Sequence, residues 1–64
     1  MKHEEFKTGM QVKMKDPDDG KTYTGFIVQV TENSVVIQWP DITEPVEHFS
    51  EEFGEIHPAN RIYT

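Results

Sequence analysis

The chain of 64 residues contains no cysteine. No disulfide can therefore cross-link the fold, and no cysteine-based zinc site can form. The absence of cysteine fits a reducing compartment but does not require one. No apolar run approaches the roughly 18 residues of a membrane-spanning helix, and the first residues lack the apolar core of a signal peptide. A cytoplasmic protein with no membrane contact is the expectation.

A chain this short can form only a small hydrophobic core. A domain of this size buries only about 60% of the surface of its unfolded chain, so side-chain packing and backbone pairing must hold it together. Residues 1–64 are expected to form one domain, present as a monomer or a weak homodimer. Residues 1–8 are either a frayed arm or one helical turn that packs Phe6 against the rest.

Lysine and arginine are missing from residues 22–60, which hold seven of the twelve carboxylates. Residues 1–21 instead balance five lysines against five acids, and the net charge of the chain is −6. A segment without cations repels phosphate, so strong nucleic-acid binding is disfavoured. The acidic half is either a solvated surface or a docking face for a partner with a basic face.

The segment from Tyr23 to Trp39 can fold back on itself as a β-hairpin in one register that sorts its side chains. That register gathers six apolar residues on one face as the pairs Val30 with Val35, Val28 with Ile37, and Phe26 with Trp39. A loop with an odd number of residues would send half of this set into water, so the register is strongly specified. The sequence therefore predicts a hairpin of strands 23–31 and 34–39 with Trp39 mostly buried.

Local patterns predict the remaining elements. Apolar residues at Met10, Val12 and Met14 alternate with polar ones, which is typical of a half-buried strand. Proline and an Asp-Gly pair then predict a turn over 16–21, and Gly25 predicts a bend or bulge within the long second strand. Further predictions are a short strand over 46–49 with Val46 and His48 facing one way, a helical turn over 50–54 capped by Ser50, a last strand over 55–57, and a tail packed through Ile62 and Tyr63.

Several of these residues match a known kind of small barrel. The matching residues are Gly9-x-x-Val12, Tyr23-x-Gly25-x-Ile27-x-x-Val30, Val35-x-Ile37-x-Trp39-x-Asp41, and Phe53 before Ile56. Over roughly residues 9–57 the chain resembles the SH3-like barrels, and the Tudor and chromo-barrel type more than the peptide-binding signalling type. The resemblance implies a mainly β fold, a single SH3-like barrel of four to five antiparallel strands with one short helical or 3-10 turn. Members of this superfamily bind methylated lysine or arginine, nucleic acid or other proteins, and very few are catalysts.

The aromatic residues allow two interpretations. An aromatic cage for a methylated cation would draw on Tyr23, Trp39, Phe49, Phe53 and Tyr63, with Asp41 as the anion beside them. Alternatively Phe26, Trp39 and Phe53 simply fill the core, which the hairpin register favours for Trp39.

Nucleic acid could be involved in two further ways. Lys13, Lys15 and Lys21 gather near the first strand, but Asp16, Asp18 and Asp19 stand between them and weaken a phosphate-binding patch. The acidic half could instead mimic nucleic acid and occupy a partner's basic cleft.

Catalysis is not expected, because no nucleophile lies beside a base and the chain offers little cleft. His48 and His57 with nearby glutamates have no recognised metal-ligand spacing, so neither a metal nor a cofactor is expected.

The chain is interpreted as a non-catalytic interaction module, an adaptor or modulator of a larger complex. The partner-binding surface is predicted where the 16–23 loop meets the 40–49 segment, because loops carry recognition. Its residues are Asp16, Asp18, Asp19, Tyr23, Asp41, Glu44, Glu47 and Phe49.

Overall fold

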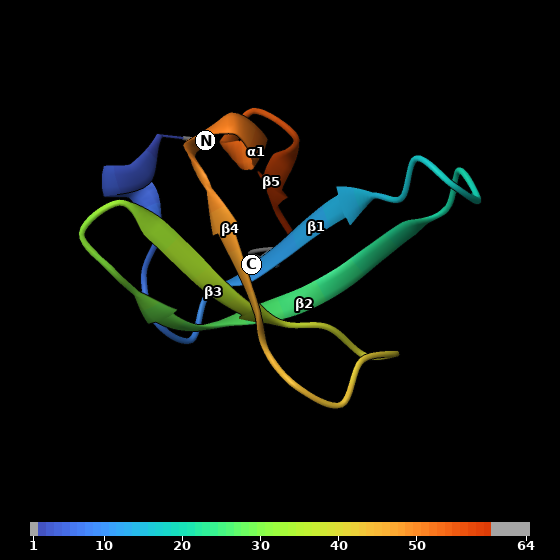
Figure 1. The fold of residues 1–64 in the computed structure, drawn as a ribbon, viewed down its shortest axis with the longest axis horizontal. Helices are drawn as coiled ribbons and strands as arrows, with labels where there is room; N and C mark the ends of the chain where they lie inside the picture. Colours follow the sequence, from blue (N-terminus) through green and yellow to red (C-terminus); the bar gives the residue numbers. More distant parts are fainter. Residues whose placement is uncertain (1, 60–64) are drawn as a thin grey trace, which may run out of the picture.

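The computed structural model describes residues 2–59 and consists of one five-stranded antiparallel sheet with two short helical elements (Figure 1). The elements are η1 (His3–Glu5), β1 (Gln11–Lys15), β2 (Thr22–Val30), β3 (Ser34–Gln38), β4 (Val46–Phe49), α1 (Ser50–Phe53) and β5 (Ile56–Pro58). The strand order is β4-β3-β2-β1-β5, so β5 returns to pair with β1 at the far edge. The prediction of a mainly β fold with four to five antiparallel strands and a short helical turn is confirmed, with five strands present.

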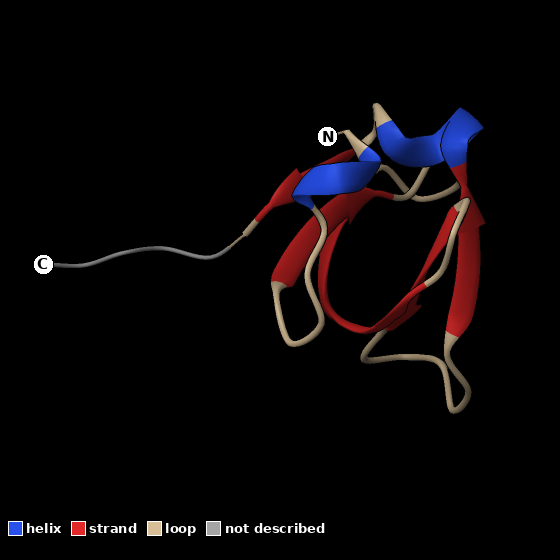
Figure 2. Cartoon of the chain, turned by 90° about the vertical axis from the view of Figure 1, so that its left-hand side faces the viewer, coloured by secondary structure: helices blue, strands red, loops and turns tan. Residues whose placement is uncertain are grey.

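The long strand β2 pairs with β1 on one side and β3 on the other, and the sheet curls strongly along it (Figure 2). The predicted turn between β1 and β2 is present. Its Gly20 has a φ of +73°, a conformation that only glycine adopts without strain. Backbone hydrogen bonds from Asp16 to the Lys21 carbonyl and from Gly20 to the Asp16 carbonyl, both 2.8 Å long, close the turn.

The β2–β3 hairpin confirms the predicted register only next to its turn. Val30 faces Val35 as predicted, but a bulge at Val28 shifts the pairing so that Ile27 faces Ile37 and Phe26 faces Gln38. The predicted pairs Val28 with Ile37 and Phe26 with Trp39 are therefore wrong. A bulge adds one unpaired residue, and the inward and outward positions exchange beyond it. Ile27 is consequently buried, whereas Phe26 and Val28 are 49% and 44% exposed.

The core lies on the inner face of the curled sheet. It comprises Phe6, Val12, Ile27, Val35, Ile37, Trp39, Phe53 and Ile56. Trp39 is only 8% exposed, which confirms its predicted burial.

Residues His3–Glu5 form η1, a single helical turn, which was one of the two interpretations of this segment. Element η1 lies beside α1 (Figures 1 and 2), and the Phe6 and Phe53 ring centroids are 5.0 Å apart. His3 stacks on Phe53 at 5.7 Å, and its Nε2 atom contacts the Thr31 carbonyl oxygen at 2.6 Å. This short element therefore covers one end of the core.

The short helix α1 begins where β4 ends, and the prediction that Ser50 caps it is wrong. Phe49 occupies the N-cap position in an extended conformation and makes no side-chain capping bond, while Ser50 is the first helical residue. The strand thus runs directly into the helix, and this places Glu52 of α1 beside His48 of β4. The predicted packing of Ile62 and Tyr63 lies outside the described residues. Within 2–59, no helix has the length and apolar character needed to cross a membrane.

Candidate functional site

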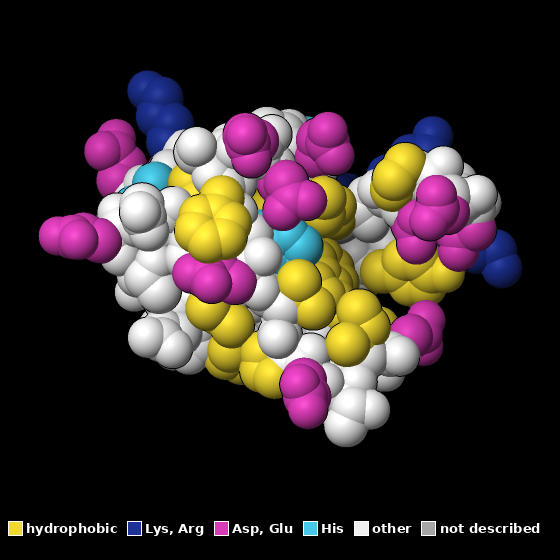
Figure 3. All heavy atoms as spheres, in the orientation of Figure 1, with side chains coloured by type: hydrophobic (Ala, Val, Ile, Leu, Met, Phe, Trp, Pro, Cys, Tyr) yellow, Lys and Arg dark blue, Asp and Glu magenta, His cyan; other side chains and the backbone are white. Residues whose placement is uncertain are grey.

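A pocket of about 320 Å³ opens where the β1–β2 turn approaches the segment that follows β3. It is visible in Figure 3 as the hollow between the lobe at the right, which carries the β1–β2 turn, and the rest of the molecule. Its lining residues are Met14, Lys15, Asp16, Pro17, Tyr23, Trp39, Pro40, Asp41, Ile42 and His48. The walls are thus mainly apolar and aromatic, with two carboxylates among them.

Trp39 reaches the pocket because β2 has no side chain at Gly25. A Cβ atom at Gly25 would lie 2.8 Å from Cε3 of Trp39 and 2.7 Å from the carbonyl oxygen of Gln38. The indole therefore packs directly on the β2 backbone. Gly25 was predicted to mark a bend or bulge. The bulge lies three residues further on, at Val28, and this glycine allows the close approach of Trp39 to β2.

Tyr23 also lines the pocket, and its side chain is held by the β1–β2 turn. Its hydroxyl donates a 2.5 Å hydrogen bond to Oδ2 of Asp19, and the backbone N–H of Lys21 donates to Oδ1 of the same carboxylate. The bond to Asp19 raises the pKa of Tyr23 to about 12, with smaller contributions from desolvation and from the charges of Asp19, Asp41 and Asp16. The bond from Tyr23 and then the one from Lys21 lower the pKa of Asp19.

These shifts predict a measurable pH dependence at the rim of the pocket. The pKa of Tyr23 lies above its ordinary value of 10. The hydrogen bond from Tyr23 to Asp19 therefore stabilises the fold fully below pH 10, and this stabilisation is lost as the pH rises through about 12. We expect an NMR titration of the Tyr23 ring to show this late ionisation. Asp19→Asn should return it toward the ordinary value, whereas Asp18→Asn, in the same turn, should leave it unchanged. Ionisation near pH 10 in the native protein would contradict the bond.

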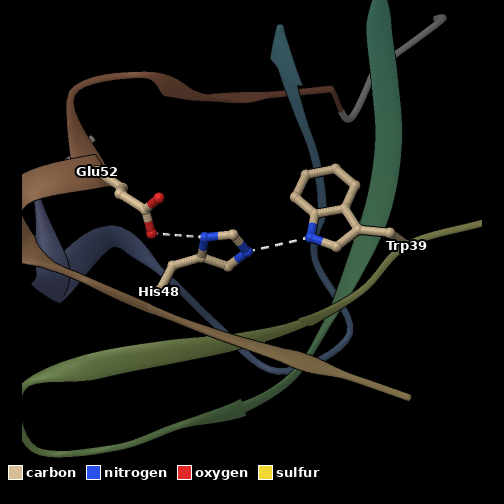
Figure 4. A network of polar contacts seen from close by, with 3 residues as sticks. All are labelled: Trp39, His48 and Glu52. Atoms are coloured by element: carbon tan, nitrogen blue, oxygen red, sulfur yellow. Dashed lines mark hydrogen bonds and ion pairs between the residues drawn. The ribbon is translucent and has the colours of Figure 1, made fainter. Parts of the chain in front are cut away.

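Two of the lining residues, Trp39 and His48, form a chain of polar contacts with Glu52 of α1 (Figure 4). Trp39 donates a hydrogen bond from Nε1 to Nε2 of His48 at 3.0 Å, and Nδ1 of His48 lies 2.8 Å from Oε1 of Glu52. His48 is 7% exposed and Glu52 is partly exposed at the surface of α1. The indole is therefore tied through the imidazole to the helix.

The structure brings together some of the predicted site residues and separates others. Asp16, Tyr23 and Asp41 line the pocket, and Asp19 contacts it through Tyr23. Asp18 is exposed in the turn and Glu44 in the loop before β4, and neither lines the pocket.

Glu47 and Phe49 lie away from the pocket. They are exposed on β4, while the alternating residues Val46 and His48 face the other way, as predicted, toward the interior. Glu47 accepts a hydrogen bond from the buried Ser34 hydroxyl, and Phe49 is 46% exposed. Of the other aromatics considered for a cage, Phe53 belongs to the core and Tyr63 lies outside the described residues, so Tyr23 and Trp39 are the two that meet.

Sequence reasoning missed the contribution of His48 and of the apolar lining from Met14, Pro17, Pro40 and Ile42. One signal for His48 was present, because it shares the inward face of its strand with Val46 and precedes Glu52 by four residues. Pro17, Pro40 and Ile42 lie in the two segments that were predicted to meet, but no sequence pattern singled out their side chains as lining. Within residues 2–59, no group of three or more histidines and carboxylates is arranged to hold a metal ion.

Two of the three lysines considered for a phosphate contact lie on the outer face of the sheet. Lys13 pairs with Thr24 on β2 and with His57 on β5, and Lys15 pairs with Thr22. All five side chains are exposed, so they form one polar face; Lys21 lies beyond it in the turn. Lys15 also contributes to the lining of the pocket.

Comparison of the chain with protein-family models, with curated proteins and with solved structures finds no match.

Proposed function

We propose that this protein is a non-catalytic interaction module that binds a protein partner by receiving a basic side chain in the pocket between the β1–β2 turn and the segment after β3. One observation carries the proposal: two segments distant in sequence meet to form an apolar and aromatic pocket whose charged lining includes two carboxylates, Asp16 and Asp41. Recognition pockets commonly combine apolar walls with a few placed polar groups.

The lining matches the chemistry of lysine and arginine side chains. Both carry an apolar stem, which can pack on Met14 and Pro17, and a cationic head, which the faces of Tyr23 and Trp39 and the carboxylate of Asp41 can stabilise. A purely aliphatic side chain would strip water from the two carboxylates without replacing their interactions. An anion would meet them with like charge. The lysine at the edge, Lys15, offsets only part of this charge.

The arrangement of strands supports the proposal that the domain is an SH3-like barrel of the Tudor type. In the five-stranded order β4-β3-β2-β1-β5, the first four strands are sequential neighbours and a helical turn precedes the last strand. In such an antiparallel arrangement the β1–β2 turn and the β3–β4 segment lie at the same end, where they line the pocket.

The polar side chains with catalytic potential are already engaged. Both ring nitrogens of His48 contact partners within the fold, Trp39 and Glu52. The Ser34 hydroxyl is buried and bonds to Glu47 and Thr31, while the nearby His3 imidazole contacts the backbone carbonyl oxygens of Thr31 and Ser34. Binding without chemical conversion is therefore the proposed activity.

The proposal predicts that a cationic peptide binds at the pocket. An acetylated tetralysine peptide should shift the amide signals of Asp16, Tyr23 and Asp41 in NMR spectra and change the fluorescence of Trp39. Added salt should weaken the binding of this peptide. Asp41→Asn should lower the affinity about tenfold, the loss of one charge-assisted contact. Glu44→Gln, a carboxylate in the same loop but outside the pocket, should lower it less than about threefold. Binding that leaves the pocket signals unchanged, or that ignores Asp41→Asn, would contradict the proposal.

A second candidate function is an association with nucleic acid through the outer face of β1. The alignment of Lys13, Lys15 and His57 across β1 and β5 favours it, and the exposed Phe26 could stack on a base. The same spectra recorded with a single-stranded oligothymidylate decide between the two. This candidate would be favoured if the oligothymidylate shifts signals at β1 and β5 more strongly than tetralysine shifts signals at the pocket. These shifts should disappear in Lys13→Gln.

A further inference from the structure

The contacts between Trp39, His48 and Glu52 define one protonation state of the imidazole. An indole N–H can only donate, so Nε2 of His48, 3.0 Å away, must accept and carries no proton. The proton of the neutral ring then resides on Nδ1, where it is donated to Oε1 of Glu52 at 2.8 Å. The hydrogen-bond network thus assigns a neutral His48 with its proton directed toward α1 (Figure 4).

A second proton on His48 is incompatible with this arrangement. It would be placed on Nε2, where it would face the N–H of Trp39, and two donors would then meet without an acceptor. Both rings are more than nine-tenths buried, so water cannot readily replace the lost bond. The contact with Glu52 would become a full ion pair and would hold the imidazole in place. The indole is therefore the group that must move.

The surroundings of Trp39 determine the direction of that movement. On one side the indole lies against the backbone at Gly25, where even a methyl group would be only 2.8 Å from its Cε3 atom. On the other side is the pocket, which the indole and the imidazole both line. The pocket is thus the open space that adjoins the indole opposite this backbone.

We propose that His48 is a proton-sensitive positioning residue for Trp39, and that its protonation displaces the indole into the pocket and closes it to the partner. The proposal concerns regulation of the same pocket and rests on the proposed function for its consequence in binding. The charged and titratable groups around the imidazole are Glu52 from α1, which contacts it, and those that line the same pocket: Lys15 and Asp16 at the end of β1, Tyr23 from β2 and Asp41 after β3. Carboxyl, ammonium and phenol groups ordinarily titrate outside pH 5.5 to 8, the range in which imidazole ordinarily changes charge.

Trp39 is the only tryptophan of the chain, so its signals report the movement without any ligand. On lowering the pH from 8 to 5.5, we expect the Trp39 Nε1–H resonance and the fluorescence emission to change in a single step. The midpoint of this step should coincide with that of the His48 ring signals. An indole signal that stays constant across this range would overturn the proposal.

Substitutions distinguish the protonation of His48 from a general effect of low pH on the domain. His48→Gln can keep an acceptor oxygen for the indole but cannot titrate, so the step should disappear. His57→Gln, an exposed histidine on β5, is the matched control and should keep it. If His48→Gln fails to fold, Glu52→Gln provides a second test: it keeps an acceptor for Nδ1 but loses the charge that favours the protonated imidazole, so the step should move to lower pH. A step that persists in His48→Gln, or that does not move in Glu52→Gln, would overturn the proposal.

The failure of this device is distinguishable from the failure of the proposed function. Tetralysine binding at pH 7.5 tests the pocket alone, whereas the spectra without peptide test the movement of Trp39 alone. If both hold, the affinity for tetralysine should fall at least tenfold between pH 7.5 and 5.5 in the native protein and less than threefold in His48→Gln. Equal losses in both proteins would show that the indole movement does not control the pocket.

Discussion

Replacing Trp39 with alanine should unfold the domain. Removing a buried aromatic side chain costs about 3–5 kcal/mol, which is comparable to the whole stability that a core of this size supplies. The loss should be severe here because the indole packs on the bare backbone at Gly25 and also satisfies Nε2 of His48. We expect circular dichroism to show a loss of the cooperative thermal transition in Trp39→Ala.

Phe26→Ala is the matched control for this substitution. The sequence pattern places both residues on the same face of the hairpin, whereas the structure buries only Trp39 and leaves Phe26 49% exposed. Phe26→Ala should therefore lower the free energy of unfolding by less than about 1 kcal/mol, as exposed substitutions do. A Trp39→Ala protein that folds and melts like the native one would show that the core does not depend on the indole. Equal losses in both variants would contradict the bulged register.

Adding a single methyl group at Gly25 should also be strongly destabilising. In Gly25→Ala, the new Cβ would lie 2.7 Å from the Gln38 carbonyl oxygen, 2.8 Å from Cε3 of Trp39 and 2.9 Å from Cγ2 of Ile37. Overpacking of this kind typically costs about 1–3 kcal/mol, and we expect the upper end because the nearest atom is backbone that belongs to the neighbouring strand. Urea denaturation followed by circular dichroism measures the loss.

Gly54→Ala controls for the general effect of replacing a glycine. Gly54 follows α1 with ordinary helical dihedral angles, and no atom outside its immediate neighbours lies within 4 Å of the position of a Cβ. Its replacement should be neutral or slightly stabilising, because alanine has less freedom to lose on folding. If Gly25→Ala were as well tolerated as Gly54→Ala, the close packing of Trp39 on β2 would be incorrect.

The elements of this fold could be predicted from local sequence. The alternation at Met10, Val12 and Met14, the turn ending at Gly20 and the inward direction of Val46 and His48 all follow from the period of two in a strand and from turn chemistry. These features depend on neighbours within a few residues. Five antiparallel strands with a short helical turn were therefore predictable before any tertiary contact was known.

The bulge at Val28 was not predictable, although it decides which side chains of β2 enter the core. A regular hairpin and a bulged one have the same apolar composition, and the choice between them depends on how β2 bends to pair with both β1 and β3. The unbulged register buries Phe26 and Val28. The bulged register buries Ile27 and leaves both of those residues half exposed.

The candidate site also has features that the sequence predicted and features that only the tertiary structure decided. The sequence alone predicted that the 16–23 loop and the 40–49 segment, which carry acidic and aromatic residues, form one surface, because loops carry recognition. Only the tertiary structure decided that Asp16, Tyr23 and Asp41 share a pocket with Trp39, while Glu47 and Phe49 face away. The contact of Trp39 with His48 likewise required β4 to pair beside β3. Such juxtapositions arise from the curvature and register of the whole sheet, which depend on packing between strands that are distant in sequence.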